Sequence, residues 1–135
     1  MASEVVVSPD LFLKYKIILI LKHMKTINRT VLIVTPKQPF MDWANGFEED
    51  TSEAEPVAVY HSTFLIPEKY DESNFKTYLK KYFSTIFEEE LYSMITDPDL
   101  WPLKRDFKTF NEWFDTQACD TVFDLSNEPL IREEF

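Results

Sequence analysis

The stretch FKTYLKKYFSTIFEEELYSMI, residues 75–95, carries apolar side chains at the spacing of one helix face. The apolar positions that follow this rhythm are 75, 79, 82, 83, 86, 87, 91, 94 and 95. The charges run against the helix dipole, because the lysines come early (76, 80 and 81) and the glutamates late (88–90). Intrinsic helix propensity is too weak to stabilise such a helix by itself, so we expect a sheet to cover its apolar face.

Three apolar segments are candidate strands for that sheet. RTVLIVT (29–35) is rich in β-branched residues and ends before a proline, which is typical of a buried strand. VAVYHSTFLIP (57–67) predicts a second strand with a bend near its middle, and ACDTVFDL (118–125) predicts a third with alternating character.

Two shorter helices are predicted on either side of the long one. Pro39 suits the first turn of a helix that Asn45 and Gly46 would end, and Asp106 is a candidate cap for the other. The second short helix has four aromatic side chains on one face: Phe107, Phe110, Trp113 and Phe114. The sequence therefore predicts an α+β fold, a single two-layer domain with a small sheet of about three or four strands, covered by one long and two short helices.

Residues 1–28 are interpreted as an N-terminal extension to a single α+β domain at 29–135. The longest uninterrupted apolar run in the extension, 17–21, is shorter than a signal-peptide core (~7–15 residues) or a membrane span (~20). We therefore expect no membrane association. Met24 is a second candidate translation start, and the choice between Met1 and Met24 stays open.

The formal net charge is −10 and is unevenly distributed. Residues 1–47 hold six bases and three acids, whereas 48–135 hold eight bases and 21 acids. Nucleic acids are disfavoured as partners, because phosphate binding needs clustered Lys and Arg. The acidic segments 48–55 and 88–99 favour a basic protein partner instead.

Several kinds of chemistry are disfavoured by composition. Gly46 is the only glycine, which excludes glycine-rich phosphate loops, the dinucleotide fingerprint and the G-x-S-x-G nucleophile elbow. Cys119 is the only cysteine, so no intrachain disulfide and no cysteine metal cluster are possible, and we expect a reducing, cytoplasmic location. We expect no cofactor, no metal and no catalytic residue.

Six residues are candidates for binding a ligand or partner: Asp42, Trp43, Trp101, Arg105, Asp97 and Asp99. The two tryptophans are candidate anchors for a partner if they are exposed. Asp97-x-Asp99 lacks the glycine and terminal glutamate of a calcium loop. For Arg105, a structural ion pair with Asp97 or Asp99 is preferred to an anion ligand held beside Trp101.

Three functions remain open from these residues, the third being mimicry of DNA by surface carboxylates spaced like phosphates. The leading hypothesis is a non-enzymatic protein-interaction module, steered by its acidic segments toward a basic partner. The alternative is a small-ligand binder or an enzyme with a cleft near Trp43, Trp101 and Arg105 that also uses Asp42.

Three segments together resemble a family of small acidic uncharacterised bacterial proteins with no assigned activity. They are VLIVTPKQPFMDWAN (31–45), DPDLWPLKRDFKTFNEWFD (97–115) and VFDLSNEP (122–129). The resemblance covers roughly residues 29 to 130 and implies an α+β domain in the bacterial cytoplasm. It implies no reaction and no site residue.

Overall fold

A computed structural model describes residues 8–14, 24–47, 62–68 and 73–135. The chain divides into two units, Met1–Asn28 with Thr121–Phe135, and Arg29–Asp120. Part of the second predicted strand (57–61) and the acidic segment 48–55 lie outside the described residues.

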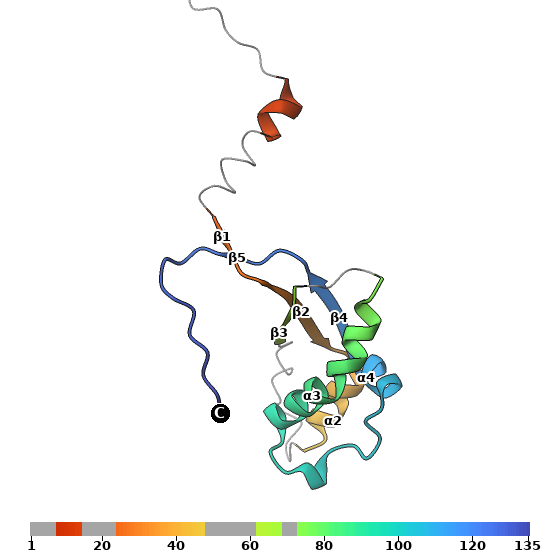
Figure 1. The fold of residues 1–135 in the computed structure, drawn as a ribbon. Helices are drawn as coiled ribbons and strands as arrows, with labels where there is room; N and C mark the ends of the chain where they lie inside the picture. Colours follow the sequence, from red (N-terminus) through yellow and green to blue (C-terminus); the bar gives the residue numbers. More distant parts are fainter. Residues whose placement is uncertain (1–7, 15–23, 48–61, 69–72) are drawn as a thin grey trace, which may run out of the picture. The chain divides into compact units, whose positions relative to one another are not determined.

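The larger unit contains a three-stranded antiparallel sheet in the order β3-β2-β4 (Figure 1). Its strands are β2 (Arg29–Pro36), β3 (Ser62–Pro67) and β4 (Phe114–Cys119). In the central strand, Leu32 lies opposite Phe64 on one side and Ala118 on the other. Alternate residues of β2 are buried, which is the pattern of a strand with one covered face. The predicted strand at 29–35 is confirmed.

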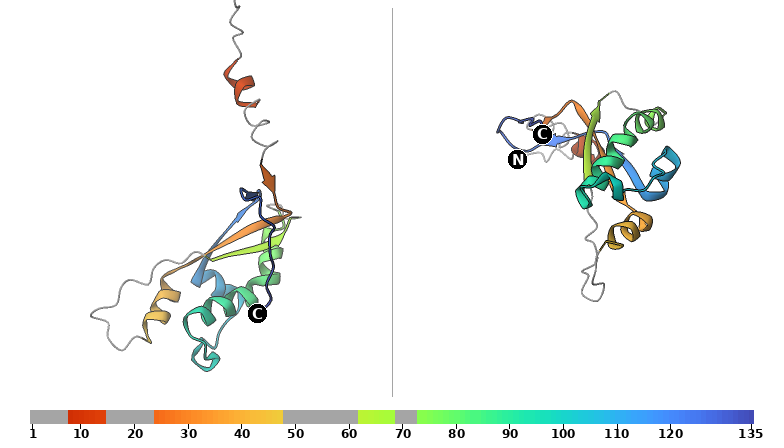
Figure 2. Two further views of the ribbon diagram at one scale, coloured as in Figure 1. Left: turned by 90° about the vertical axis from the view of Figure 1, so that its left-hand side faces the viewer. Right: turned by 90° about the horizontal axis from the view of Figure 1, so that it is seen from below.

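Three helices lie on one side of the sheet (Figure 2), and their buried side chains form one core with Leu32 and Val34 of β2. They are α2 (Gln38–Asn45), α3 (Phe75–Met94) and α4 (Phe107–Trp113). The apolar face predicted for the long helix is confirmed, since Leu79, Ile86, Phe87 and Leu91 are buried. The first turn of α3 has no acid and its last turn no base, so packing rather than the dipole stabilises it.

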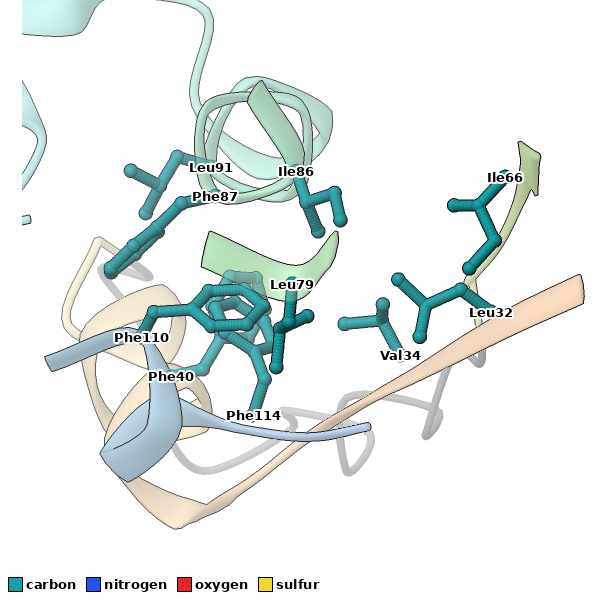
Figure 3. Packing of buried hydrophobic residues seen from close by; sticks show 10 residues of the cluster. All are labelled: Leu32, Val34, Phe40, Ile66, Leu79, Ile86, Phe87, Leu91, Phe110 and Phe114. Carbon is teal, nitrogen blue, oxygen red and sulfur yellow. The ribbon is translucent and has the colours of Figure 1, made fainter. Parts of the chain in front are cut away.

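Ten buried apolar side chains from the sheet and the three helices form one core. They are Leu32, Val34, Phe40, Ile66, Leu79, Ile86, Phe87, Leu91, Phe110 and Phe114. Figure 3 shows Phe40, Phe110 and Phe114, which come from three different elements, gathered in one aromatic cluster. The ring centroid of Phe114 lies 5.2 Å from that of Phe40 and 5.2 Å from that of Phe110. The predicted α+β arrangement of a small sheet covered by helices is therefore confirmed.

The third strand of this sheet lies earlier in the chain than its predicted range of 118–125. It begins at Phe114, where the sequence predicts continued helix, and α4 ends at Trp113. Phe114 has an extended backbone (φ −138°, ψ 143°), and the Lys37 backbone N–H donates to the Trp113 carbonyl at 2.8 Å. Pairing with the central strand thus overrides the helical spacing of the aromatics, although the Phe114 side chain is still buried.

The smaller unit holds a second, two-stranded antiparallel sheet formed by β1 (Lys25–Thr26) and β5 (Phe123–Asp124). The Lys25 Nζ donates to Asn127 Oδ1 at 2.8 Å beside this sheet. Residues 9–14 are helical. None of the helices in the described ranges combines the length and hydropathy needed to cross a bilayer.

Candidate functional site

The segment between α3 and α4 folds into a short turn of 3-10 helix, η1 (Pro98–Leu100). The Asp97 carboxylate accepts from the Asp99 N–H at 3.0 Å and so caps the turn. The Leu100 N–H donates to the Asp97 carbonyl and the Trp101 N–H to the Pro98 carbonyl, each at 3.1 Å. We call residues 97–105 the tethered loop, because two tryptophan side chains fix it to α2 and to the end of α3.

Two indole N–H groups attach the tethered loop to the body of the unit. Trp101 Nε1 donates to the carbonyl of Ile95, just after α3, at 2.8 Å. Trp43 Nε1, from α2, donates to the carbonyl of Leu100 at 3.2 Å. The Trp43 ring also packs against Phe40, with centroids 5.6 Å apart, so the loop is tied indirectly to the core.

Arg105 fixes the other end of the tethered loop. Its guanidinium donates to the Pro102 carbonyl at 2.7 Å and lies over the Trp101 ring, 5.8 Å from the centroid. The sequence favoured an ion pair with Asp97 or Asp99, but among the described residues no ion pair joins Arg105 to either. The guanidinium therefore holds a backbone carbonyl and an aromatic ring.

Asp106 begins α4 immediately after the loop. Its carboxylate accepts from the Thr109 hydroxyl at 2.6 Å and from the Thr109 N–H at 2.8 Å. These two hydrogen bonds hold the pKa of Asp106 below its ordinary value, and the bond from the Thr109 hydroxyl has the larger effect. The predicted cap is confirmed, and it fixes where the tethered loop ends.

The tethered loop turns carboxylates and leucines outward. Asp97 and Asp99 are exposed, and the side chains of Leu100 and Leu103 are 48% and 99% exposed. Lys104 lies 4.0 Å from the Asp106 carboxylate, and both side chains are largely exposed, so this contact adds little stability. The loop thus presents a mixed acidic and apolar surface on a fixed backbone.

The structure brings five of the six predicted site residues together at the tethered loop and leaves Asp42 aside. Asp97, Asp99, Trp101 and Arg105 belong to the loop, and Trp43 binds it from α2; the two tryptophans and Arg105 are half-buried. Asp42 is exposed on α2, where its carboxylate accepts from Gln38 Nε2 of the same helix at 2.8 Å. The tryptophans that the sequence suggested as exposed anchors are instead supports for the loop.

Sequence reasoning missed the two leucines of the loop surface. Leu100 and Leu103 were not singled out, because a loop that is fixed from inside by aromatics gives no periodic pattern that would mark its exposed side chains. The one available signal was the position of Leu103 between Pro102 and Lys104, which is typical of an exposed turn.

A second unpredicted feature is the buried carboxyl of Glu90, which is 5% exposed on α3. Burial raises the pKa of Glu90 above its ordinary value of 4.5. A hydrogen bond with the Ser62 side chain acts in the opposite direction, and the nearby Glu89 adds a smaller increase. An acid held this way stabilises the fold better when it is protonated.

Replacing Glu90 by glutamine is therefore expected to stabilise the protein near neutral pH by about 1 kcal/mol. The folded pKa lies above the unfolded one, so wild-type stability falls as pH rises from about 4.5 through the folded pKa. Glu90→Gln removes that fall, and the two proteins converge below pH 4.5. Urea unfolding at a series of pH values measures the difference, and the exposed Glu88→Gln serves as the control. A Glu90→Gln protein less stable than wild type at pH 7 would contradict this account.

Outside the tethered loop, one small apolar hollow of about 90 Å³ lies between β3 and α3. It is lined by Phe64, Leu65, Ile66, Tyr82, Thr85 and Ile86. The polar side-chain groups of this lining are the hydroxyls of Tyr82 and Thr85. No group of three or more metal-ligating side chains gathers in the part of the chain that the structure describes.

Comparison of the chain with known protein families, with curated proteins and with solved structures gives no match. The resemblance to small acidic bacterial proteins therefore stays a prediction.

Proposed function

We propose that the protein is a non-enzymatic interaction module that binds a basic protein partner through the tethered loop. The observation that carries the proposal is a loop whose backbone is fixed from within while Asp97 and Asp99 point outward. A loop that is already ordered loses less conformational freedom on binding than a disordered loop does, so it binds a partner more tightly for the same contacts.

Charge supports the choice of a basic partner. Residues 88–99 contain five acids and no base, and all of these acids except Glu90 are exposed. With a net charge of −10, the chain attracts cationic surfaces over distances up to the Debye length, about 8 Å at physiological salt. Such steering raises association rates more than it raises affinity. A cytoplasmic bacterial setting belongs to the same proposal and is supported by the lone Cys119 and by the resemblance.

The hydrogen-bond donors near the loop favour a protein-interaction surface over a small-ligand or catalytic cleft. The indole N–H groups of Trp43 and Trp101 are used on backbone carbonyls, and the Arg105 guanidinium donates to another. A cleft that positions a small anionic ligand would need these donors to point at the ligand. Here they maintain the loop, so their substitution should change its conformation rather than a chemical step.

Neutralising the exposed acids is expected to weaken partner capture strongly. The variant carries four changes: Glu88→Gln, Glu89→Gln, Asp97→Asn and Asp99→Asn. Asparagine caps a helix about as well as aspartate does, so the fold should be retained. Wild-type protein immobilised at low salt should retain basic proteins from a cell lysate, and both moderate salt and the variant should reduce this about tenfold or more.

The matched control removes the same number of charges elsewhere, through Glu112→Gln, Asp120→Asn, Glu133→Gln and Glu134→Gln at exposed positions, and should leave capture unchanged. Retention that is the same for wild type, variant and control would contradict the proposal. So would a captured set without basic proteins.

A further inference from the structure

We infer that the tethered loop binds its partner by inserting Leu103, with Leu100 as a second contact, into an apolar pocket edged by Lys or Arg side chains. This inference rests on the proposed function and adds which atoms make the contact. It names the partner by its chemistry, a folded protein or peptide that combines an apolar hollow with a basic rim.

Exposure of a leucine is not remarkable by itself, because single apolar side chains are common on protein surfaces. The backbone on both sides of Leu103 is what distinguishes it. The carbonyl of Leu100 is held by the Trp43 indole, and the carbonyl of Pro102, next to Leu103, is held by Arg105. Leu103 is 99% exposed between these fixed points. Its backbone therefore projects the side chain away from the core instead of allowing it to fold back.

The fixed backbone makes the leucines suitable as anchors. A flexible loop would have to be ordered on binding, which would offset much of the gain from burying an apolar side chain. Here the bonds at Asp97, Trp101 and Arg105 have already ordered the segment. Full burial of one leucine then strengthens binding by roughly 10- to 100-fold.

The rim of the complementary pocket follows from the charges beside the leucines. Asp99 directly precedes Leu100, and Asp97 caps the same turn, so two exposed carboxylates lie on the Leu100 side of the apolar contact, while the exposed Lys104 follows Leu103. A pocket that buried them without basic groups would leave charges unpaired. Lys or Arg on the partner, placed around the apolar hollow, satisfies both requirements.

The same charges favour a protein over a lipid surface. Loops that insert leucines into membranes carry basic residues that attract anionic headgroups. This chain has a net charge of −10, and the loop's own cations are Lys104, beside Asp106, and Arg105, bound to Pro102. An anionic membrane would therefore repel this surface.

The test uses the full chain as bait for a phage-displayed library of folded peptides, small domains whose surface residues are randomised so that some of them carry an apolar hollow. Selected peptides are synthesised, and their affinities are measured by fluorescence anisotropy against wild type, Leu103→Ala and Leu103→Asp. Binders should combine apolar residues with Lys or Arg, and both variants should weaken them, the aspartate at least about tenfold. Because Leu103 is fully exposed, both variants should keep the wild-type Tm and circular dichroism spectrum. Leu125→Asp, at a leucine that is 81% exposed in the other unit, is the matched control and should bind as wild type does.

The outcomes separate this inference from the proposed function. Peptides that fail to bind the Asp97→Asn and Asp99→Asn double variant but bind Leu103→Asp normally would overturn the inference and leave the proposed function standing. Failure to recover any peptide whose affinity depends on Leu103 would also overturn it. The lysate experiment with the acid variant tests the proposed function independently. In parallel, sedimentation with vesicles of phosphatidylcholine and phosphatidylserine should show no binding, and Leu103-dependent binding to these vesicles would overturn the choice of a protein partner.

Discussion

Phe87→Ala is expected to lower the free energy of unfolding by about 3–5 kcal/mol. The Phe87 side chain is fully buried at the centre of α3, with its ring centroid 5.4 Å from Phe114 and 5.9 Å from Phe110. Removing the ring leaves a cavity between the helix and the sheet that neighbouring rings fill only partly. A domain of this size is stable by only about 5–15 kcal/mol, so the variant should be partly unfolded near physiological temperature. Urea titration followed by circular dichroism and tryptophan fluorescence measures the loss.

The control lies on the same helix. Tyr92 is 55% exposed, and Tyr92→Ala should change stability by no more than about 0.5 kcal/mol. If the two substitutions had equal effects, Phe87 would not be the packing centre that the structure indicates.

Val34→Asp is expected to cost about 3 kcal/mol or more and to prevent cooperative folding at neutral pH. Val34 is completely buried in the central strand, on the face that the helices cover. A carboxylate there would lie among the apolar side chains of the core and would lose its hydration. Chemical denaturation and the dispersion of amide signals in NMR spectra both test the expectation.

The neighbouring residue gives the contrast. Ile33 points to the other face of β2 and pairs across the sheet with Thr63 and Gln117, which are polar and exposed. Ile33→Asp should therefore lower the free energy of unfolding by only about 1 kcal/mol, which is the span of strand propensities among residue types. A variant at this position as destabilised as Val34→Asp would show that both faces of the sheet are equally enclosed.

The elements that the sequence predicts best are those with the strongest periodic signal. The stripe from Phe75 to Ile95 predicts α3 nearly to the residue, and the β-branched run at 29–35 predicts the central strand. Phe114 could not be assigned from spacing, because an aromatic one position after Trp113 fits a helix face as well as a strand. Its conformation depends on pairing with β2, which is a tertiary contact.

The sequence predicted several residues of the candidate site but not what each of them does. Trp43, Trp101 and Arg105 were singled out as residues of one site, and all three meet at the tethered loop. Their partners are backbone carbonyls, which carry no sequence signature, so the supporting role could not be read from residue types. Leu103 was missed for the same reason: its exposure depends on bonds made by residues on either side of it.

The reversed charge order along α3 bears on how the chain acquires its structure. A segment with lysines near its N-terminus and glutamates near its C-terminus has little tendency to be helical by itself in water. Its partners Leu32 and Val34 lie well before it in the chain, and Phe110 and Phe114 lie after it. The helix can thus persist only once the chain as far as Phe114 is available to pack against it. Helix formation and collapse of the core should then be a single cooperative, nonlocal step, completed late during synthesis of the chain.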